Sequence, residues 1–90
     1  MKSFKIKDRI FKLSDIKRFY TAVVIKSGYG DEVTEISFKW FDSEGKGRVE
    51  PIGFGIFIIT KDEHKYQFLF NTREELDEQM GLIHLEINHP

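Results

Sequence analysis

The feature that most constrains this chain is a pair of apolar runs that flank a short polar segment. Residues 54–60 read Phe-Gly-Ile-Phe-Ile-Ile-Thr, and residues 66–70 read Tyr-Gln-Phe-Leu-Phe. Lys-Asp-Glu-His at 61–64 lies between them. Runs rich in β-branched and aromatic residues on either side of a short polar segment are typical of a β-hairpin. The sequence therefore predicts a fold built around antiparallel strands.

Alternation of apolar and charged side chains predicts a further strand at the start of the chain. Phe4 and Ile6 alternate with Lys5 and Lys7, and Arg9 continues the charged positions. Successive side chains of a strand point to opposite faces. We therefore expect one apolar face and one basic face here.

A second alternating segment follows the turn residues at 27–31. Thr34, Ile36, Phe38 and Trp40 share one parity, which predicts one face of a strand that reaches Trp40. Phe41 would then point away from Trp40 and be exposed. The segment 42–47 is expected to form the next loop, and Gly53 and Gly55 are expected to mark a bulge or a close approach of backbones.

Two periodicities fit residues 14–27. As a helix, this segment would begin at Ser14 and end at Gly28, with one apolar stripe. As a strand, alternate residues from Tyr20 to Ile25 would face opposite sides, and the β-branched and aromatic content favours this extended structure. The strand is the prediction, and the helix remains the alternative.

A helix is predicted to begin at Thr72. Thr72 followed by Glu75 is a capping box, in which the hydroxyl accepts the amide of the third helical residue. An apolar stripe then allows the helix to reach Asn88; its residues are Leu76, Met80, Ile83 and Ile87. In the alternative, the helix ends at Gly81 and a last strand follows.

Length and composition predict one domain that spans residues 1–90. The chain has no cysteine, so a disulfide framework and a thiolate metal site are excluded. No apolar run has the length of a signal peptide or of a transmembrane segment, so a cytoplasmic location is expected. The fold class predicted is β-rich α+β, an antiparallel sheet or a roll with one C-terminal helix. A helical 14–27 segment would instead give a ferredoxin-like β-α-β-β-α-β order.

The charge of the chain is unevenly distributed. Residues 1–30 carry eight basic and two acidic residues, a net +6, whereas residues 31–90 carry six and thirteen, a net −7. This asymmetry predicts a basic face that binds a partner. The expected contact residues are Lys5, Lys7, Arg9, Lys12, Lys17 and Arg18, with Tyr29 as an exposed aromatic anchor.

Two segments resemble small bacterial relatives of the pleckstrin-homology and GRAM-type domains. Phe-Lys-Leu-Ser-Asp-Ile-Lys at 11–17 is similar to the step that enters the middle strands of those domains. The hairpin at 56–70 that leads into Thr-Arg-Glu-Glu-Leu at 72–76 is similar to their last strands and helix. The resemblance implies a PH-like roll without enzymatic activity, which binds a protein or an acidic lipid headgroup. Lys5, Lys7 and Arg9 match the basic positions of the lipid-binding members.

A competing resemblance is to RNA-recognition motifs. Gly-Phe-Gly-Ile-Phe-Ile at 53–58 is similar to their Gly-Phe-Gly-Phe-Val core. The resemblance implies that Phe54 and Phe57 stack on the bases of single-stranded nucleic acid.

The sequence offers no clear catalytic constellation. His64, His84 and His89 have no nucleophile at a recognisable spacing, and the glycine pairs lack a phosphate-binding fingerprint. Neither a metal nor a cofactor is predicted. The expected function is a noncatalytic binding module, with a protein partner and a basic contact face. Nucleic-acid binding is the alternative, and an unpaired edge strand would allow a homodimer.

Overall fold

A computed structural model describes residues 2–26, 32–45 and 47–88 of the chain. Tyr29, the predicted aromatic anchor, and His89 lie outside these residues. The strands are β1 (Ser3–Ile6), β2 (Arg9–Lys12), β3 (Ile16–Lys26), β4 (Val33–Ile36), β5 (Pro51–Thr60) and β6 (Lys65–Phe70). The helical elements are η1 (Leu13–Asp15), α1 (Phe38–Trp40), η2 (Phe41–Gly45) and α2 (Arg73–Asn88). The predicted β-rich α+β class with one C-terminal helix is confirmed.

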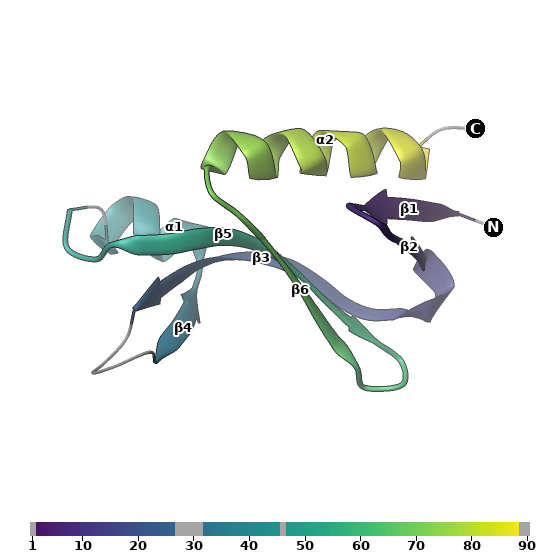
Figure 1. Ribbon diagram of the computed structural model, residues 1–90, viewed down its shortest axis with the longest axis horizontal. Coiled ribbons are helices and arrows are strands. Elements are labelled where there is room, and N and C mark those ends of the chain that lie inside the picture. Colours follow the sequence, from purple (N-terminus) through teal and green to yellow (C-terminus); the bar gives the residue numbers. More distant parts are fainter. Residues whose placement is uncertain (1, 27–31, 46, 89–90) are drawn as a thin grey trace.

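The strands form two antiparallel sheets. Strands β1 and β2 make a hairpin, and the other four make a sheet of order β4-β3-β5-β6. The hairpin and α2 lie on the same side of the four-stranded sheet (Figure 1). Residues from all three parts form the main core, among them Phe4, Ile56, Phe70, Leu76 and Ile83.

Three local predictions are confirmed. The β5–β6 hairpin forms around residues 61–64, and the segment from Ile16 to Lys26 is a strand. The ferredoxin-like order is therefore wrong, because its first helix is replaced by β3. Helix α2 begins after Thr72, whose Oγ1 accepts the Glu75 N–H at 3.1 Å, and continues through Gly81 to Asn88.

The prediction that a strand reaches Trp40 is wrong. Strand β4 ends at Ile36, and the Ser37 hydroxyl accepts the Trp40 N–H at 3.0 Å, which caps α1. Helical geometry replaces the two-residue period, so the predicted exposures are reversed. Trp40 is 42% exposed, whereas Phe41 is only 8% exposed and packs beside Val23 and Ile25.

The basic alternation at the start of the chain does not form one face. The chain reverses after Ile6, with Lys7 at a φ of 54°. Lys5 then lies opposite Ile10, whereas Arg9 lies opposite Ile6 on the other face of the hairpin. A turn inside the alternating segment is the reason that the single-strand prediction fails.

The glycine-rich start of β5 contains a bulge, and neighbouring side chains lie close to its backbone at Gly55. Val24 pairs with Gly53 and Ile25 pairs with Pro51, so Ile52 is an extra residue in β5. A Cβ atom on Gly55 would lie 2.8 Å from the ring of Phe57 and 3.0 Å from Leu69. The absence of a side chain at Gly55 lets the Phe57 ring lie flat on the sheet.

Candidate functional site

One edge of β3 is open over part of its length. Strand β3 pairs with β5 from Ile16 to Ile25, but β4 covers its other edge only from Val23 to Lys26. Within the described ranges, residues 17–22 have no neighbouring strand on that edge, but Ala22 is only 4% exposed, so the accessible edge is residues 17–21. Because alternate residues of an antiparallel strand direct N–H and C=O to the same edge, about half of these residues point both groups outward.

The departure of β4 creates this open edge. Ile36 is the last residue of β4 and pairs with Val23, so a continued strand would place Ser37 opposite Ala22. The chain turns into α1 at that point instead. In the same register, the strand that the sequence pattern predicted to reach Trp40 would have covered the edge as far as Phe19.

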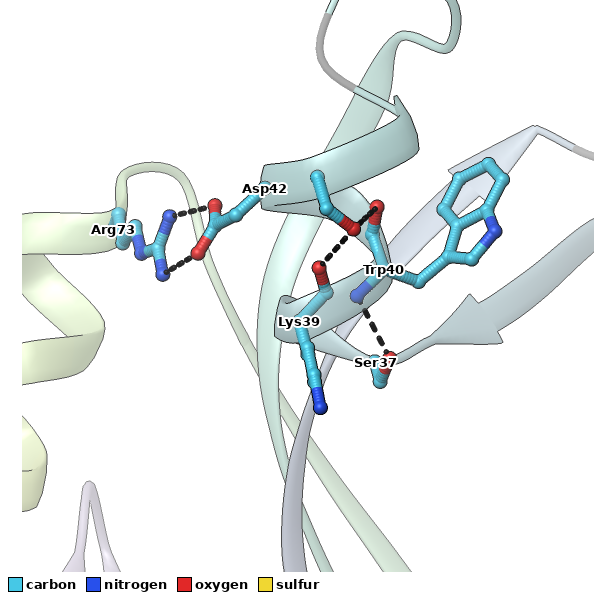
Figure 2. Close-up of polar contacts among 6 residues, drawn as sticks. Ser37, Lys39, Trp40, Asp42 and Arg73 are labelled. Carbon is cyan, nitrogen blue, oxygen red and sulfur yellow. Dashed lines mark hydrogen bonds and ion pairs between the residues drawn. The ribbon is translucent and has the colours of Figure 1, made fainter.

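An ion pair joins η2, the segment that continues α1, to helix α2. Arg73 Nη1 and Nη2 donate to Asp42 Oδ1 and Oδ2 at 2.6 and 2.9 Å. Figure 2 shows this bidentate pair together with the Ser37 cap on Trp40. The Ser43 hydroxyl also donates to the Lys39 carbonyl at 2.9 Å.

An apolar cavity of about 250 Å³ lies next to the open edge. Its walls come from the first strand, the start of β3 and one side of α2; they are Phe4, Leu13, Ile16, Phe19, Met80, Ile83, His84 and Ile87. Phe19 belongs both to the open part of β3 and to the cavity wall. A chain segment added along this edge would therefore lie beside an apolar groove.

The corresponding edge of β1 is satisfied by side chains of α2. The Lys5 N–H donates to Glu86 Oε2 at 2.9 Å, and Gln79 Nε2 donates to the Lys5 carbonyl at 3.1 Å. The backbone of the open part of β3 has no equivalent side-chain contact among the described residues. This contrast singles out β3 as the edge that is open to a ligand.

The structure separates the predicted basic residues into two groups. On the hairpin, Lys7 Nζ donates to the Leu69 carbonyl at 3.2 Å and lies 5.0 Å from the ring centroid of Phe70. The Arg9 guanidinium lies 4.7 Å from the ring centroid of Tyr66. Lys5 and Lys12 project from the outer face of the hairpin, opposite Ile10 and Ser3.

The second group lies at the open edge itself. Lys17 forms an ion pair with Glu63 at 2.6 Å, and the Arg18 guanidinium stacks 5.1 Å from the ring centroid of Tyr20. In the part of the chain that the structure describes, no carboxylate is paired with Arg18. Arg18 is therefore the cation that this edge presents to a ligand.

A hydrogen-bonded cluster crosses the other face of the sheet. Tyr20 and Phe57 stack at 5.1 Å, and Glu35 accepts hydrogen bonds from the Tyr20 hydroxyl and from Lys65 Nζ, each at 2.7 Å. Burial acts to raise the pKa of Glu35, but the hydrogen bonds from Lys65 and Tyr20 outweigh it and lower that pKa. Three strands, β4, β3 and β6, are thereby joined around the ring of Phe57 from β5.

The two aromatic residues of the alternative nucleic-acid interface are occupied by contacts within the protein. Phe57 is 0% exposed, and Phe54 packs against the rings of Phe38 and Phe41. Base stacking needs an exposed aromatic face. Phe57 presents no such face, and the partly buried Phe54 ring is stacked on Phe38.

The described residues contain no group of three or more His, Cys, Asp or Glu side chains arranged to hold a metal ion. His64 Nδ1 contacts Asp62 at 2.8 Å in the β5–β6 turn, and His84 lines the groove. No helix in the described ranges combines the length and the apolar character needed to cross a membrane.

Comparison with protein families, with characterised proteins and with solved structures finds no match for this chain. The resemblance to pleckstrin-homology and GRAM-type domains therefore stays a prediction.

Sequence reasoning identified Lys17 and Arg18 but missed the apolar part of this site. Ile16, Phe19, Met80 and His84 come from segments that are about 60 residues apart in the sequence. Their apolar members were expected only as core residues.

Proposed function

We propose that this chain is a noncatalytic protein-interaction module whose contact site is the open edge of β3 with the adjacent groove. The proposal keeps the predicted class of function but moves the contact surface away from the β1–β2 hairpin. Of the predicted basic residues, Lys17 and Arg18 belong to the site.

The observation that carries the proposal is the combination of unpaired strand backbone with an apolar groove, both of which include Phe19. Exposed strand edges bind extended segments of other proteins through main-chain hydrogen bonds, and neighbouring pockets select side chains. The open backbone of β3 supplies the main-chain groups, and the apolar groove beside Phe19 supplies the pocket. Arg18 lies on the opposite face of the same strand.

Affinity capture with the tagged chain tests this function. Arg18→Glu and Met80→Glu change the edge and the groove wall, while Arg48→Glu is a matched control at an exposed arginine outside the site. The proposal expects at least one protein that is retained by the wild type and by Arg48→Glu but lost with both site variants. Circular dichroism establishes that each variant is folded.

Two results would overturn the proposal. One is retention of no protein, or equal retention by all four forms of the chain. The other is binding of the purified chain to vesicles with acidic headgroups, or to single-stranded oligonucleotides, that is lost with the site variants while no protein depends on them.

A further inference from the structure

The geometry points to a specific class of ligand: an extended protein segment with alternating apolar and acidic residues, which adds to the four-stranded sheet next to β3. This inference rests on the proposed function and assigns the chemistry of the partner at the same site. It follows from the backbone edge, the groove and the charges on either face of β3.

The open edge sets the length and the path of the ligand. Residues 17–21 span five positions, which at about 3.3 Å per residue correspond to about 17 Å of extended chain. The ligand would lie in line with β4, in the position that β4 leaves after Ile36. An antiparallel orientation continues the pairing that β4 makes with β3 and is the more stable pairing per residue.

The groove selects apolar side chains on one face of the ligand. Phe19 faces the core side of the sheet, as do Ile56 and Ile58 on β5. Because side chains of neighbouring strands that face the same side lie together, every second residue of the ligand would point toward Phe19 and Met80. Apolar residues at these positions would be removed from water.

Arg18 selects acidic side chains on the other face. Arg18 pairs with Ile59 and Tyr20 pairs with Phe57, so both lie on the side of the sheet away from α2. Lys17 already has Glu63 as its partner, whereas the Arg18 guanidinium is stacked on Tyr20 and free of an ion pair within the described residues. A carboxylate on the ligand would complete this arrangement with a charge-assisted hydrogen bond.

A second copy of the same edge fits less well than an acidic segment. Antiparallel pairing of two β3 edges about Phe19 would place Lys17 of one chain opposite Thr21 of the other and Arg18 opposite Tyr20, so neither cation would face an acidic residue. Lysine at a strand edge is a known means of preventing self-pairing. The charge of the edge therefore favours a different, acidic strand.

Fluorescence anisotropy with the 90-residue chain and synthetic peptides tests the ligand class. The probe is a labelled eight-residue peptide in which Glu alternates with Val, Leu and Phe. Matched peptides carry Lys in place of every Glu, or a central Pro that removes an amide donor. We expect the glutamate peptide to bind at least about tenfold more tightly than the other two, because only it offers both the charge and an uninterrupted strand.

Reversal of the charge at position 18 tests the role of Arg18 most directly. Arg18→Glu should weaken binding of the glutamate peptide and strengthen binding of the lysine peptide, whereas Arg48→Glu should leave both affinities unchanged. Met80→Glu should weaken both peptides because it disrupts the groove. Equal affinity of the two peptides for the wild type, or no exchange of preference in Arg18→Glu, contradicts the inference.

Amide hydrogen exchange locates the bound peptide. We expect new protection at alternate amides of residues 17–21 and none along β6. Protection confined to β6 or to α2 contradicts the inference, as does self-association without peptide that protects residues 17–21.

The two proposals fail in distinguishable ways. A captured protein that the glutamate peptide does not displace overturns the ligand class but leaves the interaction function standing. If no protein is captured and no peptide binds, the interaction function and the ligand class are both overturned.

Discussion

Arg73 and Asp42 form a bidentate ion pair that joins the first residue of α2 to η2, with Nη–Oδ distances of 2.6 and 2.9 Å. The same guanidinium lies 4.7 Å from the ring centroid of Phe38 (Figure 2 shows the ion pair). These contacts fix the segment that follows β4 against the helix. They thereby keep this segment off the edge of β3, which makes Arg73 a determinant of the candidate site without being part of it.

Arg73→Met should destabilise the fold through loss of this pair. Both partners are about half exposed, so we expect a coupling free energy between Arg73 and Asp42 of about 0.5–1 kcal/mol. A double-mutant cycle with Asp42→Asn, followed by urea unfolding, measures it. High salt should reduce the coupling.

The Arg48–Glu44 pair is the matched control for that cycle. Its separation is 3.9 Å and it is more exposed, so its coupling should not exceed about 0.5 kcal/mol. A coupling between Arg73 and Asp42 no larger than that of the control would show that the bidentate geometry adds nothing to stability.

Gly55→Ala should destabilise the protein, whereas Gly81→Ala should stabilise it. A Cβ atom at Gly55 meets the Phe57 ring at 2.8 Å, and such overpacking costs about 1–3 kcal/mol. Gly81 lies in α2, where a Cβ atom would meet nothing within 4 Å beyond the backbone of the helix itself, so alanine should add up to about 1 kcal/mol through helix propensity. Thermal unfolding followed by circular dichroism compares the two variants, and a change of the same sign in both would contradict this account.

Phe41→Ala should cost far more stability than Trp40→Ala. Phe41 is 8% exposed and its truncation should cost about 3–5 kcal/mol, whereas Trp40 keeps 42% of its surface in water. Urea unfolding gives both values. Trp40 is the single tryptophan of the chain, so strong quenching of its fluorescence by acrylamide provides an independent check. A larger loss of stability in Trp40→Ala than in Phe41→Ala would contradict the observed burial and agree with the exposures that the sequence pattern predicted.

Acidification should weaken the β5–β6 turn through Asp62. Hydrogen bonds from Thr60 and His64 lower the pKa of Asp62 from 3.8 to about 2. A carboxyl whose pKa is lower in the folded state stabilises that state above the unfolded pKa, and this contribution is lost as the pH falls from 3.8 toward 2.

Urea unfolding between pH 2 and pH 5 on wild type and Asp62→Asn measures this contribution. The asparagine variant should lack this part of the pH dependence, and Thr60→Val should reduce it, because the Thr60 hydroxyl is the donor that lowers the pKa of Asp62 most. Parallel pH profiles for the wild type and Asp62→Asn would disprove the role of Asp62.

The sequence by itself determined the elements whose signals are local. The hairpin of β5 and β6 follows from two apolar runs around a polar turn, and α2 begins where Thr72 can accept the Glu75 amide. In β3, the β-branched and aromatic residues favoured the extended structure that is observed. Each of these signals involves residues a few positions apart, so no distant contact is needed to decide it.

Only the tertiary structure decided the path of residues 37–45 and the edge that they leave open. The alternation from Thr34 to Trp40 favours a strand, but the cap at Ser37 favours a helix, and both local preferences are worth about 1 kcal/mol. Contacts of Arg73 with Asp42 and of Phe41 with the core settle this competition. Those partners are distant in the sequence, and because the burial of Phe41 and the pairing of Asp42 exist only after the chain has folded, no local pattern could reveal them.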